Sequence, residues 1–285
     1  MLNLRSSTER THRLPSFWDP IAFGLAALYA VVIVVPIYFV VISSFKSNLE
    51  IFRDPLALPS HYDLTNFITA FDRARLGEAF ANSAVIVVGA LALSTLVGLP
   101  AAYGIVRLRG KLGGLLEGFF ALGLLIPIFP LLLPVFLLAA GAGLVGSPVY
   151  IILVYTAIRT PITVLILTRF MRQVPSELIE SAEIDGAGPV AVVRHIVLPL
   201  VSPGLVTILI LNFVDLWNEY FFAFVLLRTE SRTIQVAVPS LQTEYFTEFG
   251  YLAAGIIVSV IPVYVLLVVF QRRISENIFS GALAS

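Results

Sequence analysis

The chain has 285 residues, of which 58% are apolar and only 13% are charged, whereas soluble proteins average about 45–50% and about 25%. A soluble domain of this length has too little interior to bury so many apolar side chains, so the composition excludes a disordered chain and argues against an ordinary soluble enzyme. Lys plus Arg equals Asp plus Glu at 18 each, which gives no indication of nucleic acid binding, and the absence of cysteine excludes disulfides, thiolate metal sites and a cysteine nucleophile.

Six stretches of the chain are long and apolar enough to cross a bilayer, which requires about 20 residues of helix. Gaps between charged residues mark most of them, and a glycine-rich run from Gly141 to Pro148 divides the longest gap into two helices. The expected helices lie near residues 21–44, 82–106, 115–140, 149–170, 203–227 and 249–270. The sequence therefore predicts an all-α, polytopic membrane protein with six transmembrane helices.

The third expected helix contains Pro127, Pro130 and Pro134. Each proline removes a backbone donor and can bend the helix. Within a membrane such breaks are tolerated only against protein or water. This helix is therefore expected at a subunit interface or beside a transport pathway, or else as a kinked packing helix.

The distribution of Lys and Arg predicts the orientation, because cytoplasmic segments carry the excess of basic residues. Six spans place both termini on one side, and the segments on that side carry eleven basic residues against six on the other. Both termini are therefore predicted to be cytoplasmic. The predicted parts are a cytoplasmic N-terminal segment (1–20), a transmembrane domain (21–270) with an extracytoplasmic loop (46–80) and a cytoplasmic loop (171–202), and a cytoplasmic tail (271–285).

The chain lacks the motifs of an ATPase or a hydrolase. Gly110-Lys111 is followed by Leu112, and Ile105 stands where a P-loop would have its first glycine. The three histidines have no metal-ligand spacing, and no G-x-S-x-G nucleophile elbow occurs. We therefore expect no catalytic residue, no metal site and no cofactor bound by this chain. If transport consumes ATP, a partner chain must bind it.

The cytoplasmic loop has the pattern of two short helices over residues 175–203. Ser176 is a suitable N-cap, and Glu177 and Glu180 lie near the positive end of the first helix dipole. Gly186 stands where that helix should end in a left-handed conformation. Pro189 suits the first turn of the second helix, and Pro199 is expected to end it.

The first of these short helices combines small residues with acids. Ser181 and Ala182 permit close backbone approach, and Glu180 and Glu183 suit a basic partner surface. The plainer alternative is an amphipathic connector that lies on the membrane, although such interfacial helices are usually basic rather than acidic.

The segment resembles the EAA loop of binding-protein-dependent ABC transporter permeases. Eight positions match that motif at its spacing: Glu180, Ala182, Asp185, Gly186, Ala187, Ile196, Leu198 and Pro199. Ser181 replaces the usual alanine, and Val193 stands where an aromatic residue is common. The resemblance implies the permease fold of a type I ABC importer and a coupling helix that docks on a cytoplasmic ATPase subunit. The residues implied in ATPase coupling are Glu180, Ser181, Ala182, Asp185, Gly186 and Ala187.

The fifth expected helix carries polar residues inside an apolar stretch. Asn212, Asp215 and Glu219 fall at i, i+3 and i+7 and so share one face of a continuous helix. A charge at the centre of a span costs about 2.5–3.5 kcal/mol on insertion scales, so this face should meet a partner helix or a wet pathway. Arg159 lies at similar depth in the fourth helix. We predict an Arg159–Asp215 ion pair, whose role is either functional or purely structural.

The residues around this face suit a sugar. Trp217, Asn218, Glu219 and Tyr220 combine aromatic faces with hydrogen-bonding groups. Their sequence resembles the carbohydrate branch of the ABC permeases, of the maltose type, as do the Asn82-Ser83 opening of the second helix and the ending at Gln271–Ile274. The residues expected along the translocation pathway are Asn212, Asp215, Trp217, Asn218, Glu219 and Tyr220.

Together these features predict a non-catalytic permease subunit of an ABC importer for a sugar or a sugar-like polyol. It would lie in the cytoplasmic (inner) membrane of a bacterium or archaeon. The implied partners are a second homologous permease, an ATPase dimer that binds ATP and Mg, an extracytoplasmic solute-binding protein, the sugar and membrane lipid. Two alternatives remain open: another solute class, such as an amino acid, peptide or phosphate ester, or a proton-coupled secondary transporter that uses Asp215 and Glu219.

Overall fold

The computed structural model describes residues 18–108, 111–242 and 247–282, and the regular structure within these ranges is helical. Five long helices form the body: α1 (Trp18–Ser43), α4 (Leu76–Arg107), α7 (Pro148–Met171), α10 (Leu198–Trp217) and α13 (Phe249–Ala282). The shorter helices are α2 (Asn48–Arg53), α3 (Thr65–Ala74), α5 (Lys111–Leu124), η1 (Phe129–Leu131), α6 (Leu132–Gly141), α8 (Ser176–Ile184), α9 (Pro189–Val192), η2 (Val193–Val197), α11 (Phe221–Leu226), α12 (Ile234–Ala237) and η3 (Pro239–Leu241).

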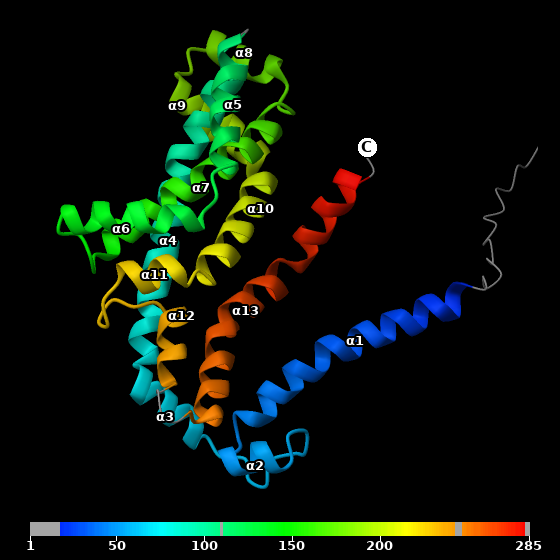
Figure 1. Ribbon diagram of the computed structural model, residues 1–285. Coiled ribbons are helices and arrows are strands. Elements are labelled where there is room, and N and C mark those ends of the chain that lie inside the picture. The colour runs from blue at the N-terminus through cyan, green and yellow to red at the C-terminus, as the bar shows by residue number, and fades with distance from the viewer. Residues whose placement is uncertain (1–17, 109–110, 243–246, 283–285) are drawn as a thin grey trace, which may run out of the picture.

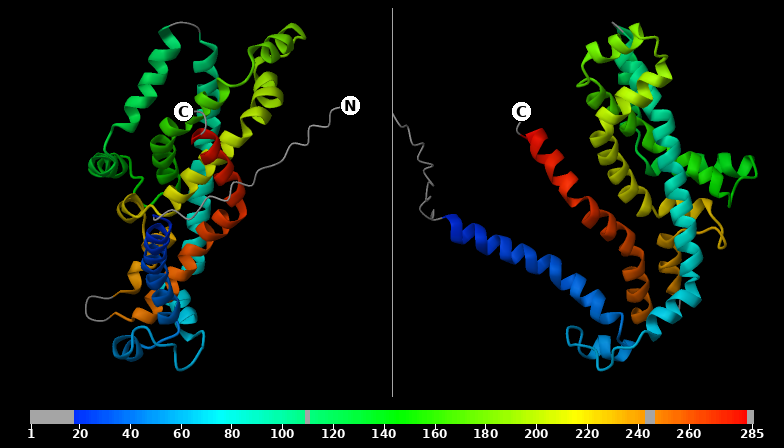
Figure 2. Two further views of the ribbon diagram at one scale, coloured as in Figure 1. Left: turned by 90° about the vertical axis from the view of Figure 1, so that its right-hand side faces the viewer. Right: turned by 180° about the vertical axis from the view of Figure 1, so that it is seen from behind.

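The two large loops lie at opposite ends of the molecule. Figure 1 shows α8 and α9 at one end and α2 and α3 at the other, and α4 runs the length between them. The two further views in Figure 2 agree, and the right-hand view shows α1 and the far part of α13 leaning away from the other helices. Most apolar side chains of α1 are exposed, as expected for a helix whose surroundings are lipid or another subunit.

The number of helices that could cross a membrane depends on how the third apolar stretch is counted. Five of the described helices are long and apolar enough. A sixth span is counted if α5 and the segment Phe129–Gly141 are taken together, although they are bent by 84° at the break between them. The prediction of one continuous helix over residues 115–140 was therefore wrong, because the segment is two helices at a large angle to each other. Pro127 and Pro130 remove donors and disfavour helical conformations of the residues before them, which explains the break.

The fifth span also differs from its prediction. It begins at Leu198 rather than near residue 203, and its helix ends at Trp217, ahead of the short α11. Pro199 does not end the preceding helix as predicted. It lies at the start of α10, and because the π-helical turn η2 joins α9 to α10 without a gap, this proline is inside a continuous helical stretch.

Of three further predicted boundaries, the structure corrects the first. Asn82 and Ser83 do not open the second span, because α4 already begins at Leu76. The predicted tail, 271–285, continues the last helix as far as Ala282. Most of the predicted N-terminal segment, 1–20, lies outside the described residues.

The segment between α1 and α4 is a small cap held by a buried lysine. The ammonium group of Lys46 donates to the carbonyls of Asp54 (3.0 Å) and Pro55 (3.3 Å). Nearby, the hydroxyl of Ser60 and the backbone N–H and hydroxyl of Ser47 donate to the carboxylate of Glu50. These bonds, that from the Ser60 hydroxyl above all, lower the pKa of Glu50 to about 2. The cap is therefore ordered by its own polar contacts.

The interior consists of two clusters of apolar side chains, one toward each end. The first joins α3, α4, α6, α7, α10, α11, α12 and α13 around residues such as Ile86, Tyr155 and Trp217. The second joins α4, α7, α8, α9 and α10 around residues such as Leu167 and Ile208. At Gly204 an added Cβ would lie 2.3 Å from the ring of Phe170, so this position permits the close approach of α10 and α7.

Candidate functional site

An intramembrane ion pair links α7 and α10. Nη1 of Arg159 donates to Oδ2 of Asp215 at 2.7 Å, and the side chains are 18% and 55% exposed. The structure thus brings together the two residues that similar depth in neighbouring helices had suggested as partners. The pair leaves most of the guanidinium away from solvent, where an unpaired charge would be costly.

A second polar contact lies one turn away on the same two helices. The side chain of Asn212 is buried and donates to Oγ1 of Thr163 at 3.0 Å. Thr163 in turn donates to the carbonyl of Arg159 at 2.8 Å. Asn212 and Asp215 therefore both face α7, and together they fix the register of α10 against that helix.

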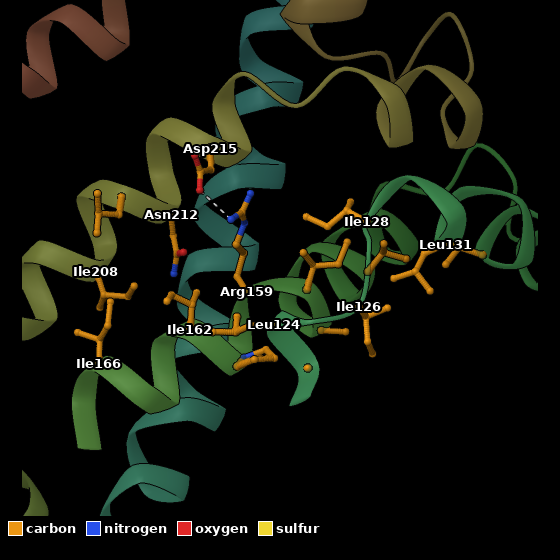
Figure 3. Close-up of a pocket in the computed structure, with 17 residues that line it drawn as sticks. Leu124, Ile126, Ile128, Leu131, Arg159, Ile162, Ile166, Ile208, Asn212 and Asp215 are labelled. Atoms are coloured by element: carbon orange, nitrogen blue, oxygen red, sulfur yellow. Dashed lines mark hydrogen bonds and ion pairs between the residues drawn. The ribbon is translucent and has the colours of Figure 1, made fainter. Parts of the chain in front are cut away.

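A cavity of about 590 Å³ opens beside this pair. Figure 3 shows Arg159 and Asp215 directed toward each other, with Asn212 close by on α10. The opposite wall comes from the break between α5 and α6, with Leu124, Ile126, Ile128 and Leu131. The cavity is therefore apolar over most of its lining and polar at one end, as in many small-molecule sites.

Glu219 does not share the face of Asn212 and Asp215, because α10 has already ended. Its Oε1 accepts the N–H of Phe222 (2.9 Å), and its Oε2 accepts the N–H of Ala223 (3.1 Å) and the buried Tyr155 hydroxyl (2.5 Å). The carboxylate thus caps the first turn of α11. The prediction of a continuous helix through Glu219 was therefore wrong, and its carboxylate fixes the chain direction after Trp217 by accepting three hydrogen bonds.

Trp217 lies in the core rather than beside a cavity. Its indole N–H donates to the carbonyl of Ser259 on α13 at 2.9 Å, and its ring stacks on Phe213 and meets Phe80 edge-on. A buried tryptophan with a satisfied N–H is a packing residue. Trp217 was predicted to lie along the translocation pathway, whereas its side chain is buried among the helices.

Asn218 and Tyr220 remain near the surface of a second, smaller cavity. This cavity has a volume of about 220 Å³ and is bordered by Arg159, Asn218, Glu219 and Tyr220, which the sequence had suggested. It is also bordered by Phe129, Tyr155 and Phe221, which sequence reasoning missed. The one available signal was that Tyr155 precedes Arg159 by four residues and so lies on the same helical face.

In the loop between α7 and α10, the first helix, α8, ends at a glycine in the left-handed region of backbone conformation. Gly186 has φ +87°, and the N–H groups of Gly186 and Ala187 donate to the carbonyls of Glu183 (3.1 Å) and Ala182 (2.9 Å). These two bonds form a Schellman motif. Pro189 lies in the first turn of α9 as predicted. Ser176 is the first helical residue of α8 rather than its N-cap, which is Pro175 and makes no side-chain capping bond.

One face of α8 is held by the core and the other is free. Ile179 is buried, and Ala182 and Ala187 pack against the second apolar cluster. On the opposite side Glu180, Ser181, Asp185 and Gly186 are exposed. Ile184, the last residue of α8, is also on the free side and is 86% exposed.

Two ion pairs connect this end of the molecule to the long helices. Nη2 of Arg107, at the end of α4, lies 2.5 Å from Oε1 of Glu183 on α8. Arg172, which follows α7, makes a two-bond contact with Glu117 on α5 at 2.5 and 3.1 Å. These two ion pairs therefore attach the loop to α4 and α5. Among the residues that the structure describes, no group of three or more His, Asp or Glu side chains is placed to hold a metal ion.

The chain is similar to known transport proteins over most of its length. The family model for the binding-protein-dependent transport system inner membrane component matches residues 94–279. The diacetylchitobiose uptake system permease protein of Streptomyces coelicolor is 34% identical over 264 residues, which covers 92% of this chain and 87% of the relative. The melibiose/raffinose/stachyose import permease protein of Bacillus subtilis is 30% identical over 260 residues, which covers 90% and 94%.

The fold is also found among solved structures. A chain of a bacterial ABC transporter involved in the import of the acidic polysaccharide alginate superposes with a TM-score of 0.78 at 22% identity, covering 91% of this chain and 99% of that one. At this identity the likeness establishes the fold. The family match extends over more than half of the chain, and the chain therefore belongs to the binding-protein-dependent transport system inner membrane components, the permeases of ABC transporters.

Proposed function

We propose that the chain is one permease subunit of an ATP-driven importer that moves a sugar or a sugar-like polyol across the cytoplasmic membrane by alternating access. The substrate class is proposed from the names of three relatives that are 30% to 34% identical to this chain. These relatives are named as permease proteins for diacetylchitobiose, for melibiose with raffinose and stachyose, and for trehalose. The polar residues inside the span, Arg159 and Asp215, agree with a hydrophilic cargo.

The exposed face of α8 supports coupling to an ATPase. Its acidic residues suit a basic partner surface, and Gly186 and Ser181 leave room for close approach. An ATPase dimer would bind ATP and Mg, and closure of that dimer would move the two coupling loops, one on this chain and one on a second, homologous permease. An extracytoplasmic binding protein would deliver the sugar. The related alginate transporter has been crystallised with an alginate pentasaccharide-bound periplasmic protein.

Transport of a panel of sugars tests the proposed substrate class. Cells that contain this chain together with its partner subunits and binding protein are given radiolabelled diacetylchitobiose, melibiose and trehalose. Uptake of one of these sugars is expected to stop when ATP is depleted and to persist when an ionophore collapses the proton gradient. Uptake that follows the proton gradient would instead support a secondary transporter. The structure does not favour that alternative, since Asp215 pairs with Arg159 and both oxygens of Glu219 are occupied.

The orientation of the chain can be tested with two single cysteines, because the native sequence has none. Ser60→Cys lies in the cap and Ser176→Cys lies at the start of α8, and both serines are exposed. On intact spheroplasts an impermeant thiol reagent is expected to label Ser60→Cys and to leave Ser176→Cys unlabelled until the membrane is opened. The reverse pattern would invert the assignment of the cytoplasmic side.

The ion pair between Arg107 and Glu183 is expected to matter for coupling rather than for stability. Both side chains are more than one-third exposed, and exposed pairs contribute only about 0–1 kcal/mol to stability. Arg107→Glu and Glu183→Arg should each leave the thermal midpoint of the complex unchanged and reduce sugar-stimulated ATP hydrolysis and uptake by about threefold. The double exchange restores the pair and should recover both. Failure of the double variant to recover would mean that the contact does not connect α8 to α4 in the working complex.

A further inference from the structure

The smaller cavity lies where two interrupted helices meet. One wall comes from the break between α5 and α6, with Ile128 and Phe129, and the other from the break between α10 and α11, with Asn218 to Phe221. Helices α6 and α11 contact each other at this point. Backbone that leaves a helix at membrane depth is tolerated where it borders protein or a water-filled space, and interrupted helices are a common way to build transporter binding sites.

The guanidinium group of Arg159 has donors to spare at this cavity. Its hydrogen-bond partner among the described residues is Asp215, which it reaches through Nη1 alone. Nε is buried and has no hydrogen-bond partner among the described residues. A guanidinium has five N–H donors, so the donors of Nη1 and Nη2 that Asp215 does not take are those left for a ligand at the cavity.

Aromatic rings form the apolar part of the same cavity. Phe129 meets Phe221 edge-on, with ring centroids 5.2 Å apart and the planes at 90°. Tyr220 meets Phe221 at 5.5 Å and 82°. Rings at right angles offer flat faces in two directions, and such faces suit the C–H side of a sugar ring while the polar side remains free for hydrogen bonds.

The charges around the cavity favour an uncharged ligand. Arg159 is balanced by Asp215, and the carboxylate of Glu219 carries a negative charge that would repel an anion. Glu219 already accepts three hydrogen bonds from the chain, two of which position the first turn of α11. The amide nitrogen of Asn218 donates once, to the carbonyl of Val214 at 2.8 Å, and retains a second N–H.

We infer that this cavity is a subsite for one uncharged sugar ring, which Arg159 and Asn218 hold by hydrogen bonds and which packs against Phe129 and Phe221. The inference rests on the proposed function and specifies where this subunit touches its substrate. The volume of about 220 Å³ is below the usual range of about 300–1,000 Å³ for sites that enclose a drug-sized ligand. The cavity therefore fits a single ring of a longer sugar.

Protection of a cysteine tests the subsite in the assembled complex. Phe221→Cys introduces a unique thiol on this chain at the cavity wall, and labelling by an impermeant methanethiosulfonate is followed with and without the sugar that the wild-type complex takes up. The matched control is Phe224→Cys, one turn further on α11, which is similarly exposed (59% against 50%) and does not border the cavity. Sugar is expected to slow labelling of Phe221→Cys about tenfold and to leave Phe224→Cys unchanged.

A second variant tests whether the sugar protects the cysteine by direct contact or only because the whole complex closes when sugar binds. Arg159→Lys keeps a positive charge opposite Asp215 and removes the forked donors. In the Phe221→Cys background it should raise the sugar concentration needed for protection about tenfold, which corresponds to the loss of one hydrogen bond to a charged donor. Equal protection at Phe221→Cys and Phe224→Cys, or protection that Arg159→Lys leaves unchanged, would overturn the subsite.

The choice of ligand separates failure of the subsite from failure of the proposed function. If the wild-type complex takes up none of diacetylchitobiose, melibiose and trehalose, the substrate class is wrong and the subsite falls with it. If it takes up one of them without protecting Phe221→Cys, only the subsite is wrong. Glucose 6-phosphate serves as the charged probe, and protection by it as strong as that by the neutral sugar would overturn the preference for an uncharged ring.

Discussion

Gly186→Asp is expected to leave the protein in the membrane at a near-normal level and to abolish transport. Gly186 has φ +87°, a conformation that costs other L-residues about 1–2 kcal/mol. Within the chain itself an added Cβ would meet no atom within 4 Å, so folding should survive. If the loop sits in a fitted socket on an ATPase, overpacking there costs a further 1–3 kcal/mol or so, and a charge adds desolvation. The measurements are membrane abundance, ATPase co-purification and uptake.

Three controls separate the contributions at this turn. Gly186→Asn has nearly the same shape as Gly186→Asp without the charge, and asparagine tolerates the left-handed region. Gly188→Asp places the same charge in the same loop, where φ is −72° and the surroundings are also open. Ser181→Ala should be almost silent, because the Ser181 hydroxyl bonds only to carbonyls of its own helix. Normal transport by Gly186→Asp would mean that the turn does not carry the coupling contact.

Asp215→Ala is expected to lower the yield of assembled complex. It leaves Arg159, of which only 18% is exposed, without its carboxylate. Removing one partner of a buried pair costs up to about 3–5 kcal/mol, and the partial exposure of Asp215 argues for the lower end of that range. The measurements are the amount of complex in the membrane and its thermal midpoint after purification. Normal amounts of Asp215→Ala complex would mean that the pair does not stabilise the fold.

The double variant Arg159→Met with Asp215→Leu tests whether Asp215→Ala acts by leaving the charge of Arg159 unpaired. Replacing both members of a buried pair by apolar residues is often neutral for stability, so the amount of complex should recover. Transport should not recover, because the donors of Arg159 are then missing from the cavity. Recovery of both stability and transport would assign the pair a purely structural role.

The segments that could cross a membrane were predictable from the sequence, because hydropathy and the lack of charge over about 20 residues are local properties. The shape of the interrupted helices could not. Pro127 and Pro130 indicated a possible bend, but the angle of 84° depends on how α6 packs against α11. The second break has no proline or glycine at Asn218–Tyr220. It coincides with the capping of α11 by Glu219 and the hydrogen bond from Tyr155, of which the second is a tertiary contact.

The errors at the candidate site follow from that hidden break. The i, i+3, i+7 spacing placed Glu219 beside Asp215 on a helix assumed to be continuous, whereas it turns toward α11. Trp217 was grouped with its polar neighbours, although its ring packs in the core. Asp215 and Arg159 were paired correctly because depth in the membrane can be counted from the ends of a helix. Phe129 was missed because it reaches the cavity only through the bend.

Pro199 lies within a helix instead of ending one, and this has a mechanical consequence. Residues 189–217 form one continuous helical stretch that begins at Pro189, close to Gly186, and ends at Trp217, between Leu216 and Asn218, which both border the smaller cavity. At 1.5 Å per residue a rod of this kind is about 43 Å long, so a tilt of about 5° at one end displaces the other by about 4 Å. The wider π-helical turn at η2 is a natural pivot. A small displacement of the loop at Gly186 would therefore change the width of the smaller cavity through rotation of this helix alone. No chain of side-chain rearrangements between the two places would be needed.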